Sequence, residues 1–219
     1  MGAAQADNLE LVRLLLKNGA EKTSQDKNGH SAFDFALSRR DPALNELLQT
    51  VYFVPIGDAP MSEINALINH YREKFGIEIQ ALPPLALNSA NLDTDRQQLI
   101  AETLLDSMRQ AHADYAGNRS VILIGITRQD MYPRGENWQF CFGQRVVGLR
   151  AAVVSTARMA LHYPGEPTSE ATLAVRLRKV VTKDIGIMYF EKSSNNNPRS
   201  VLYDGILGIE ELDRVTEDF

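Results

Sequence analysis

An uninterrupted apolar run at residues 121–126, Val-Ile-Leu-Ile-Gly-Ile, constrains the fold more than any other segment of the sequence. A strand that is apolar at every position must be covered on both faces, as a central strand is when helices pack on either side of its sheet. The run therefore predicts a globular domain built around a buried sheet.

The segments on both sides of this run show further strand and helix patterns. Short β-rich or alternating stretches predict strands at residues 51–56, 77–80, 138–142 and 151–155. Apolar residues spaced three and four apart predict helices over residues 62–75, 93–113 and 170–189. We therefore expect an α+β or mixed α/β domain in which long helices pack against a mixed sheet.

The first 50 residues differ from the rest because they contain only helix patterns and turns. Helices are predicted over residues 9–16, 31–38 and 41–48. Asn18-Gly19 ends the first helix, and Asp41 with Pro42 begins the third as a capping residue followed by a proline in the first turn. The sequence thus divides into a helical segment at residues 1–50 and a larger domain at residues 51–219.

Composition and charge exclude several classes of function. The net charge of −5 and the isoelectric point of about 5.4 provide no positive field for holding nucleic acid. No stretch approaches the roughly 18 apolar residues that a membrane-spanning helix requires, and the first residues lack a signal-peptide pattern. A single cysteine, Cys141, excludes an internal disulfide and favours a reducing compartment. We expect a cytoplasmic protein with no nucleic-acid or membrane partner.

Two strings in the helical segment resemble ankyrin repeats. They are residues 8–20, Asn-Leu-Glu-Leu-Val-Arg-Leu-Leu-Leu-Lys-Asn-Gly-Ala, and residues 26–36, Asp-Lys-Asn-Gly-His-Ser-Ala-Phe-Asp-Phe-Ala. The second string has Ser-Ala-Phe-Asp at residues 31–34 where the family has Thr-Pro-Leu-His, and such divergence is usual in a terminal repeat. The resemblance implies a partial array over residues 3–49 with a protein-binding surface. A plain helical hairpin stays open as the alternative.

Several strings in the larger domain resemble the archaemetzincins, a family of zinc metallopeptidases. They are residues 51–57, Val-Tyr-Phe-Val-Pro-Ile-Gly, residues 124–132, Ile-Gly-Ile-Thr-Arg-Gln-Asp-Met-Tyr, residues 142–143, Phe-Gly, and residues 152–158, Ala-Val-Val-Ser-Thr-Ala-Arg. The strings occur in the family's order. The resemblance implies a metzincin-like mixed sheet in which the last long helix carries the catalytic site.

The catalytic signature of that family is His-Glu-x-x-His-x-x-Gly followed by a third histidine. Residues four apart share a helix face, so two histidines can hold one zinc ion while the glutamate acts as the general base. In the matching helix, Lys183 stands at the first histidine, Asp184 at the glutamate and Ile187 at the second histidine. Phe190 stands at the glycine and Ser193 at the third histidine. Since an ammonium has no lone pair and isoleucine cannot ligate, the resemblance implies a degenerate zinc site and no bound metal.

Other residues offer no replacement for the missing ligands. No two histidines lie at metal-ligand spacing in one element, and the four are His30, His70, His112 and His162. Cys141 lies between two phenylalanines with no histidine nearby, which favours a buried structural thiol over a nucleophile.

The last long helix raises two further expectations. Asp184 interrupts an apolar arc, so we expect it to be buried and paired with a cation, or else to be a residual general acid or base. The candidate cations are Arg158, Arg199 and Lys183. Arg176, Lys179 and Lys183 form a basic stripe, which is either a solvated helix edge or an anion site.

These observations favour a pseudoprotease that binds a protein or an extended peptide and needs no cofactor. In metzincins the substrate lies along an edge strand above the active-site helix, and such pairing uses backbone hydrogen bonds that do not require zinc. The resemblance implies that this edge is formed by Trp138, Gln139, Phe140, Cys141 and Phe142. Two alternatives stay open. One is a divergent zinc-dependent metallopeptidase or other hydrolase of the family, and the other is a domain that only caps the ankyrin array.

Overall fold

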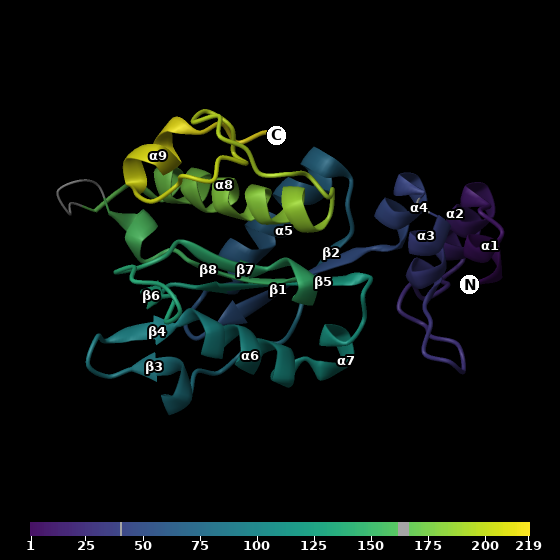
Figure 1. Ribbon diagram of the computed structural model, residues 1–219, viewed down its shortest axis with the longest axis horizontal. Helices are drawn as coiled ribbons and strands as arrows, with labels where there is room; N and C mark the ends of the chain where they lie inside the picture. Colours follow the sequence, from purple (N-terminus) through teal and green to yellow (C-terminus); the bar gives the residue numbers. More distant parts are fainter. Residues whose placement is uncertain (40, 162–166) are drawn as a thin grey trace.

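The computed structural model describes residues 1–39, 41–161 and 167–219. A helical segment at the N-terminus is followed by a part in which strands and helices alternate (Figure 1). His162, one of the four histidines considered above, lies outside the described residues. Within the described part, no helix combines the length and the apolar character that crossing a bilayer requires.

A five-stranded sheet forms the centre of the larger part, with the strand order β2-β1-β5-β8-β7. The parallel strands are β1 (Thr50–Ile56), β2 (Ile79–Ala81), β5 (Val121–Thr127) and β8 (Ala151–Ser155), and the antiparallel edge strand is β7 (Gly143–Val146). Strand β5 is the middle strand, and all of its residues are buried. The prediction of a buried central strand is therefore confirmed.

Helices cover both faces of this sheet. On one face lie α5 (Met61–Phe75) and α8 (Glu170–Met188), and on the other lie α6 (Ala101–Ala111) and α7 (Ala113–Ala116) (Figure 1). Successive residues of a strand point to opposite faces, so β5 contributes alternate side chains to two separate apolar cores. Each fully buried aliphatic side chain in these cores stabilises the fold by about 1.5–3 kcal/mol.

Gly125, in the middle of β5, allows α6 to approach the sheet closely. A Cβ atom at this position would lie 2.5 Å from Cδ1 of Ile56 and 2.8 Å from Sδ of Met108. Both distances are shorter than van der Waals contact, so a larger residue would push α6 away from the strand.

A second, three-stranded sheet leads into α6 and was not predicted. Its strands are β3 (Leu92–Asp93), β4 (Gln98–Ile100) and β6 (Met131–Tyr132), and a 3₁₀ turn, η1 (Ser89–Asn91), precedes them. The helix predicted over residues 93–113 is wrong at its beginning, because residues 92–99 pair as a hairpin and α6 begins at Ala101. Asp93 favours this turn, since its Oδ1 accepts from the backbone N–H groups of Asp95 and Arg96.

The helical segment contains α1 (Gly2–Gln5), α2 (Leu9–Lys17), α3 (Ala32–Arg39) and α4 (Pro42–Leu48). The three predicted helices are present, and α1 is additional. Their buried side chains form a core of their own, which includes Val12, Phe33 and Leu44. Asp41 caps α4 as predicted, because its Oδ1 accepts from the N–H of Ala43 at 2.8 Å.

A buried polar junction joins these helices to the sheet. The Gln49 side chain donates to the carbonyls of Asn45 and Tyr189, at 3.0 and 3.3 Å. Its Oε1 accepts from the Arg150 guanidinium. The Tyr189 hydroxyl donates to the carbonyl of Glu46 at 2.5 Å. Since buried polar groups are costly without partners, these bonds fix the helical segment against the end of α8.

The chain beyond α8 forms a C-terminal tail, residues 190–219, that returns along the outer side of that helix (Figure 1). It contains α9 (Ile209–Arg214), which no sequence pattern predicted. Two short 3₁₀ turns, η2 (Val147–Leu149) and η3 (Arg158–Ala160), flank β8. This tail, α8 and the edge of the large sheet together enclose a cleft.

Candidate functional site

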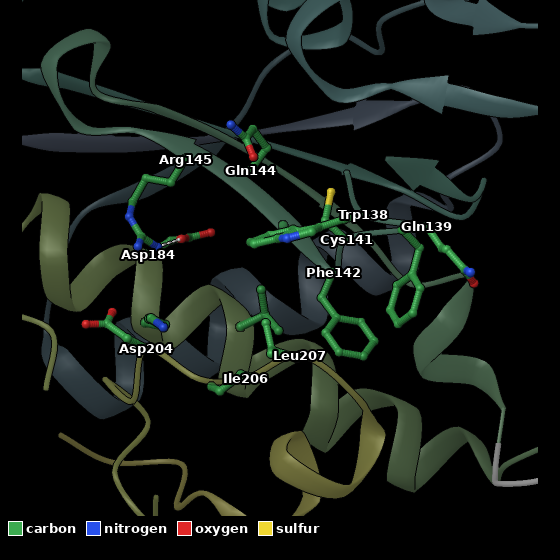
Figure 2. Close-up of a pocket in the computed structure, with 14 residues that line it drawn as sticks. Trp138, Gln139, Cys141, Phe142, Gln144, Arg145, Asp184, Asp204, Ile206 and Leu207 are labelled. Carbon is green, nitrogen blue, oxygen red and sulfur yellow. Dashed lines mark hydrogen bonds and ion pairs between the residues drawn. The ribbon is translucent and has the colours of Figure 1, made fainter. Parts of the chain in front are cut away.

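A cleft of about 530 Å³ opens between the sheet edge, α8 and the C-terminal tail. The sheet edge contributes residues 138–145, α8 contributes Val180, Lys183 and Asp184, and the tail contributes Asp204, Ile206 and Leu207. Figure 2 shows the charged side chains at one end of the cleft and the aromatic side chains at the other. A chain lying in this cleft would therefore meet polar and apolar surroundings in turn.

The segment from Trp138 to Phe142 (Trp138, Gln139, Phe140, Cys141, Phe142) lines this cleft, but the prediction that it is a strand is wrong. The edge strand is β7, which begins immediately after it. The carbonyls of Trp138 and Gln139 accept from the side chain of Arg96 instead of from a neighbouring strand. Any role of these five residues in peptide binding stays a prediction.

Among the described residues, backbone groups along the outer side of strand β7 have no hydrogen-bond partner. The carbonyl of Phe142 accepts from the N–H of Ser155 at 2.9 Å, which marks a hydrogen-bonded pair at the start of the β7·β8 ladder. Directly opposed residues alternate between bonded and non-bonded pairs in antiparallel strands. The N–H and C=O groups of Gly143 and Arg145 therefore point away from β8, toward the open edge of the sheet.

Asp184 is buried, as predicted, but its cationic partner is none of the three residues expected. Its carboxylate pairs with Arg145, which reaches across the cleft from β7. Burial raises the pKa of Asp184, and the arginine opposes that shift. Among the described residues its second oxygen, Oδ2, has no hydrogen-bond partner. In Figure 2 this carboxylate extends from the Arg145 end toward Trp138.

Lys183 and Arg158 have other partners, which explains why neither pairs with Asp184. The ammonium of Lys183 donates to the carbonyl of Tyr203 in the tail, and burial lowers the pKa of this lysine. Arg158 forms an ion pair with Asp130 at 2.5 Å.

The other residues that the sequence comparison placed at the family's signature positions lie outside the cleft. Ile187 is half-buried and is absent from the cleft lining, and Ser193 is exposed in the tail. Phe190 packs its ring against those of Phe75 and Phe219, with centroids 5.4 and 5.3 Å apart. The residue with a left-handed backbone (φ 51°) is Glu191, one position after the place of the family's glycine. The structure therefore brings together only Lys183 and Asp184 of the predicted set.

Zinc does not fit the side chains at these positions. A protonated lysine has no lone pair, Ile187 has no donor atom, and Asp184 is engaged by a guanidinium. Across residues 1–39, 41–161 and 167–219, no group of three histidine, cysteine or acidic side chains is placed to hold a metal ion. The chemistry that these residues support directly is hydrogen bonding and charge pairing.

The basic stripe on α8 is not a solvated edge, so that interpretation was wrong, and its cations bind groups of the chain itself. Arg176 is fully buried and forms an ion pair with Asp213 at 2.6 Å. Lys179 donates to the carbonyls of Leu212 and Asp213, both at 3.0 Å. Together with Lys183, these cations attach the C-terminal tail to α8. The sequence pattern missed this because the tail residues that these cations reach lie at least 20 residues away in the chain.

Cys141 is a buried thiol, as expected. It is 6% exposed, and burial raises its pKa to about 12. A thiol with such a pKa is protonated at neutral pH and is a poor nucleophile. At the cleft, Cys141 therefore contributes by packing and not as a nucleophile.

Two residues that shape the site were not singled out from the sequence. Arg145 lines the charged end of the cleft, and Arg96 holds its rim. No local motif marks them, because each acts through contacts with segments distant in the chain. A correct register for β7 would have identified Arg145, since that register points it toward α8.

No protein-family model matches the sequence. Among curated relatives, the archaemetzincin of Pyrococcus furiosus is 28% identical over 158 residues, which covers 70% of this chain and 79% of the relative. The archaemetzincin of Pyrococcus abyssi is 26% identical over 162 residues, covering 72% of this chain and 83% of the relative. The alignments thus span most of each relative.

Solved structures agree with the sequence relatives. The crystal structure of archaemetzincin from Methanopyrus kandleri is 25% identical, has a TM-score of 0.62, and is matched over 78% of this chain and 88% of its own. The archaemetzincin of Archaeoglobus fulgidus, complexed with malonate, has a TM-score of 0.62 at 20% identity, over 78% of this chain and 95% of its own. The mixed sheet and its helices therefore have the fold of these proteins, and the chain contains an archaemetzincin-like domain.

Proposed function

We propose that this chain is a peptide-binding protein whose archaemetzincin-like cleft does not hydrolyse peptides. The observation that carries the proposal is the ion pair between Asp184, at the position of the family's general base, and Arg145 on the opposite wall. A general base needs an acceptor oxygen directed at the reacting water. In this cleft one carboxylate oxygen bonds to a guanidinium, and the other is buried without a partner among the described residues. The neighbouring Lys183 bonds to the tail.

The cleft retains features that suit an extended peptide. The outer side of β7 offers the unpaired backbone groups of Gly143 and Arg145, to which a peptide can add as a further strand. Trp138 on one wall is 47% exposed and Leu207 on the other is 65% exposed. A bound strand would direct alternate side chains toward these apolar surfaces.

The helical segment supplies a second part of the proposal, a protein-binding surface of the ankyrin type. Helix α2 exposes Leu11, Leu14 and Leu15, whose exposed fractions are 41%, 56% and 43%. Residues three and four apart form one stripe on a helix, and exposed apolar patches are typical of protein interaction sites.

The comparisons support a second candidate, a divergent zinc-dependent metallopeptidase or other hydrolase. The relatives are archaemetzincins. The cleft borders α8, the helix whose sequence we matched to the family's signature. In that case Asp184 would serve as the general base, and the raised pKa that burial gives it would suit proton transfer. Metal binding would then require ligands other than the described groups.

One experiment separates the two candidates. An array of random eight-residue peptides is probed with the purified protein, and the strongest ligand is titrated while the fluorescence of Trp138, the single tryptophan, is recorded. We expect the dissociation constant to be unchanged by a metal chelator. A control peptide of the same sequence, N-methylated at alternate residues, should bind poorly because it cannot pair with the strand edge.

The hydrolase candidate is tested with the same peptide. The protein is incubated with the peptide and added zinc, and the products are followed by mass spectrometry. Cleavage that disappears in Asp184→Asn would overturn the binding proposal in favour of the enzyme. Equal affinity for the N-methylated peptide would remove strand addition as the mode of binding.

A further inference from the structure

The rim of the cleft is an irregular segment that side chains hold in place. The carbonyls of Trp138 and Gln139 accept from Nη2 of Arg96, at 3.2 and 2.8 Å. The carbonyl of Gln139 also accepts from the side chain of Gln98 at 2.9 Å. Both donors belong to the hairpin formed by β3 and β4, so the small sheet supplies bonds that a neighbouring strand would otherwise provide.

Arg96 is itself held in a defined position. Its Nε donates to Oε1 of Gln98 at 2.8 Å, and its guanidinium carbon lies 3.7 Å from the ring centroid of Tyr132. The Tyr132 hydroxyl donates to Asp93 at 2.5 Å. Gln98 is only 6% exposed and also donates to Asp130, at 2.8 Å. A guanidinium stacked on an aromatic ring presents its donors in a fixed plane, which a lysine at the same position would not do.

These contacts determine where Trp138 stands in the cleft. The backbone carbonyl of Trp138 accepts from Arg96. The indole of Trp138 forms the exposed aromatic wall that Figure 2 shows facing Arg145 and Leu207. Without that support, the segment would have two carbonyls bonded to water and more conformational freedom. Peptide binding would then have to restrict this freedom and would be weaker.

We infer that Arg96 and Gln98 are positioning residues that fix the Trp138 rim and thereby set the affinity of the cleft for peptide. The inference rests on the proposed peptide-binding function. The small sheet contributes no residue to the cleft lining. Through Arg96 and Gln98 it nevertheless determines how tightly the cleft binds peptide.

The inference is tested first without any peptide. In Arg96→Met we expect the fluorescence of Trp138 to move to longer wavelength and to be quenched more readily by acrylamide, because the rim is released. Arg96→Lys should give an intermediate shift. Arg72→Met is the matched control, since Arg72 also donates to a carbonyl, that of Ile79 on β2, at the opposite edge of the large sheet.

The second arm measures the affinity of the peptide selected above. Loss of a preorganised rim should weaken binding by about tenfold in Arg96→Met, with little change in Arg72→Met. Gln98→Leu, which removes the second donor, should show a smaller loss. Thermal melting of each variant shows that the chains compared are folded.

The outcomes separate this inference from the proposed function. If wild-type protein binds no peptide, the proposed function fails, and the fluorescence arm still decides whether Arg96 positions the rim. If peptide binds but the fluorescence and affinity of Arg96→Met equal those of the wild type, the positioning role is overturned. An equal loss in Arg72→Met would also overturn it, because the effect would then be one of general stability.

Discussion

Helix α8 carries two ion pairs, each with one buried member, that differ in how completely the buried group is satisfied. Arg176 donates to both carboxylate oxygens of Asp213, at 2.7 and 2.6 Å, and to the carbonyls of Met159 and Leu161 at 2.7 and 2.8 Å. Eight residues later, Asp184 pairs with Arg145 through one oxygen, while its other oxygen has no partner among the described residues.

The difference teaches where this helix is structural and where it is open to function. A buried charge stabilises a fold only when its remaining donors and acceptors are bonded. The Arg176 pair meets that condition and attaches the tail to the helix. The Asp184 pair does not meet that condition, because Oδ2 of Asp184 has no partner among the described residues. It lies at the cleft, and an unsatisfied buried group of this kind is typical of a functional site.

The largest effect is expected for Arg176→Ala. This change leaves a cavity and removes the arginine donor from the carbonyls of Met159 and Leu161, so we expect the free energy of unfolding to fall by about 4 kcal/mol. Denaturant unfolding monitored by circular dichroism measures it. Arg178→Ala is the control, because its partner Glu217 and the arginine itself are partly exposed, and it should cost less than about 1 kcal/mol. Equal losses in both variants would contradict the structural role assigned to Arg176.

A smaller effect is expected for Asp184→Ala. The Arg145 side chain is 22% exposed and can turn toward water when its partner is removed, and the cost of the unpaired Oδ2 also disappears. We therefore expect a loss of about 2 kcal/mol, below the range typical for breaking a fully buried pair. The same unfolding assay measures this loss. A loss as large as that of Arg176→Ala would show that the two pairs contribute equally to stability.

The smallest effect is a dependence on pH. Because burial raises the folded-state pKa of Asp184, its contribution to stability is present below the ordinary carboxyl pKa of 3.8 and is lost as pH rises through the folded value. Relative to Asp184→Asn, the wild type should therefore lose stability as pH rises from 3.8 toward the folded-state pKa, by at most about 1.4 kcal/mol per pH unit. Unfolding free energies of both proteins over a pH series give this difference. A gain with rising pH would mean that Arg145 outweighs burial.

Local patterns predicted the four parallel strands of the main sheet and the two long helices, α5 and α8, that cover one face. The apolar run of β5 and the apolar spacing in α5 and α8 depend on residues close together in the chain, and those elements are present. The hairpin of β3 and β4 was missed because each strand has only two or three residues. Its pairing depends on tertiary contacts, which override the helix pattern of residues 93–100.

The candidate site was predicted only in part, because only some of its features depend on residues close together in the chain. The burial of Asp184 followed from its place in an apolar arc, which is a property of one helix. Its pairing with Arg145 depends on the register of β7, and the anchoring of Lys183 depends on the path of the tail. Sequence patterns contain neither, because both contacts join segments at least 20 residues apart.

The polar junction at Gln49 links the melting of the two parts of the molecule. Withdrawing the helical segment would strip Gln49 of its bond to Arg150, and would separate the Tyr189 hydroxyl from Glu46. These groups have their partners only when both parts are folded. Unfolding of one part therefore leaves polar groups of the other part unpaired and destabilises it. The helices and the sheet therefore form one cooperative unit, and a protein bound to α2 would stabilise the distant cleft through shared folding free energy rather than through any movement.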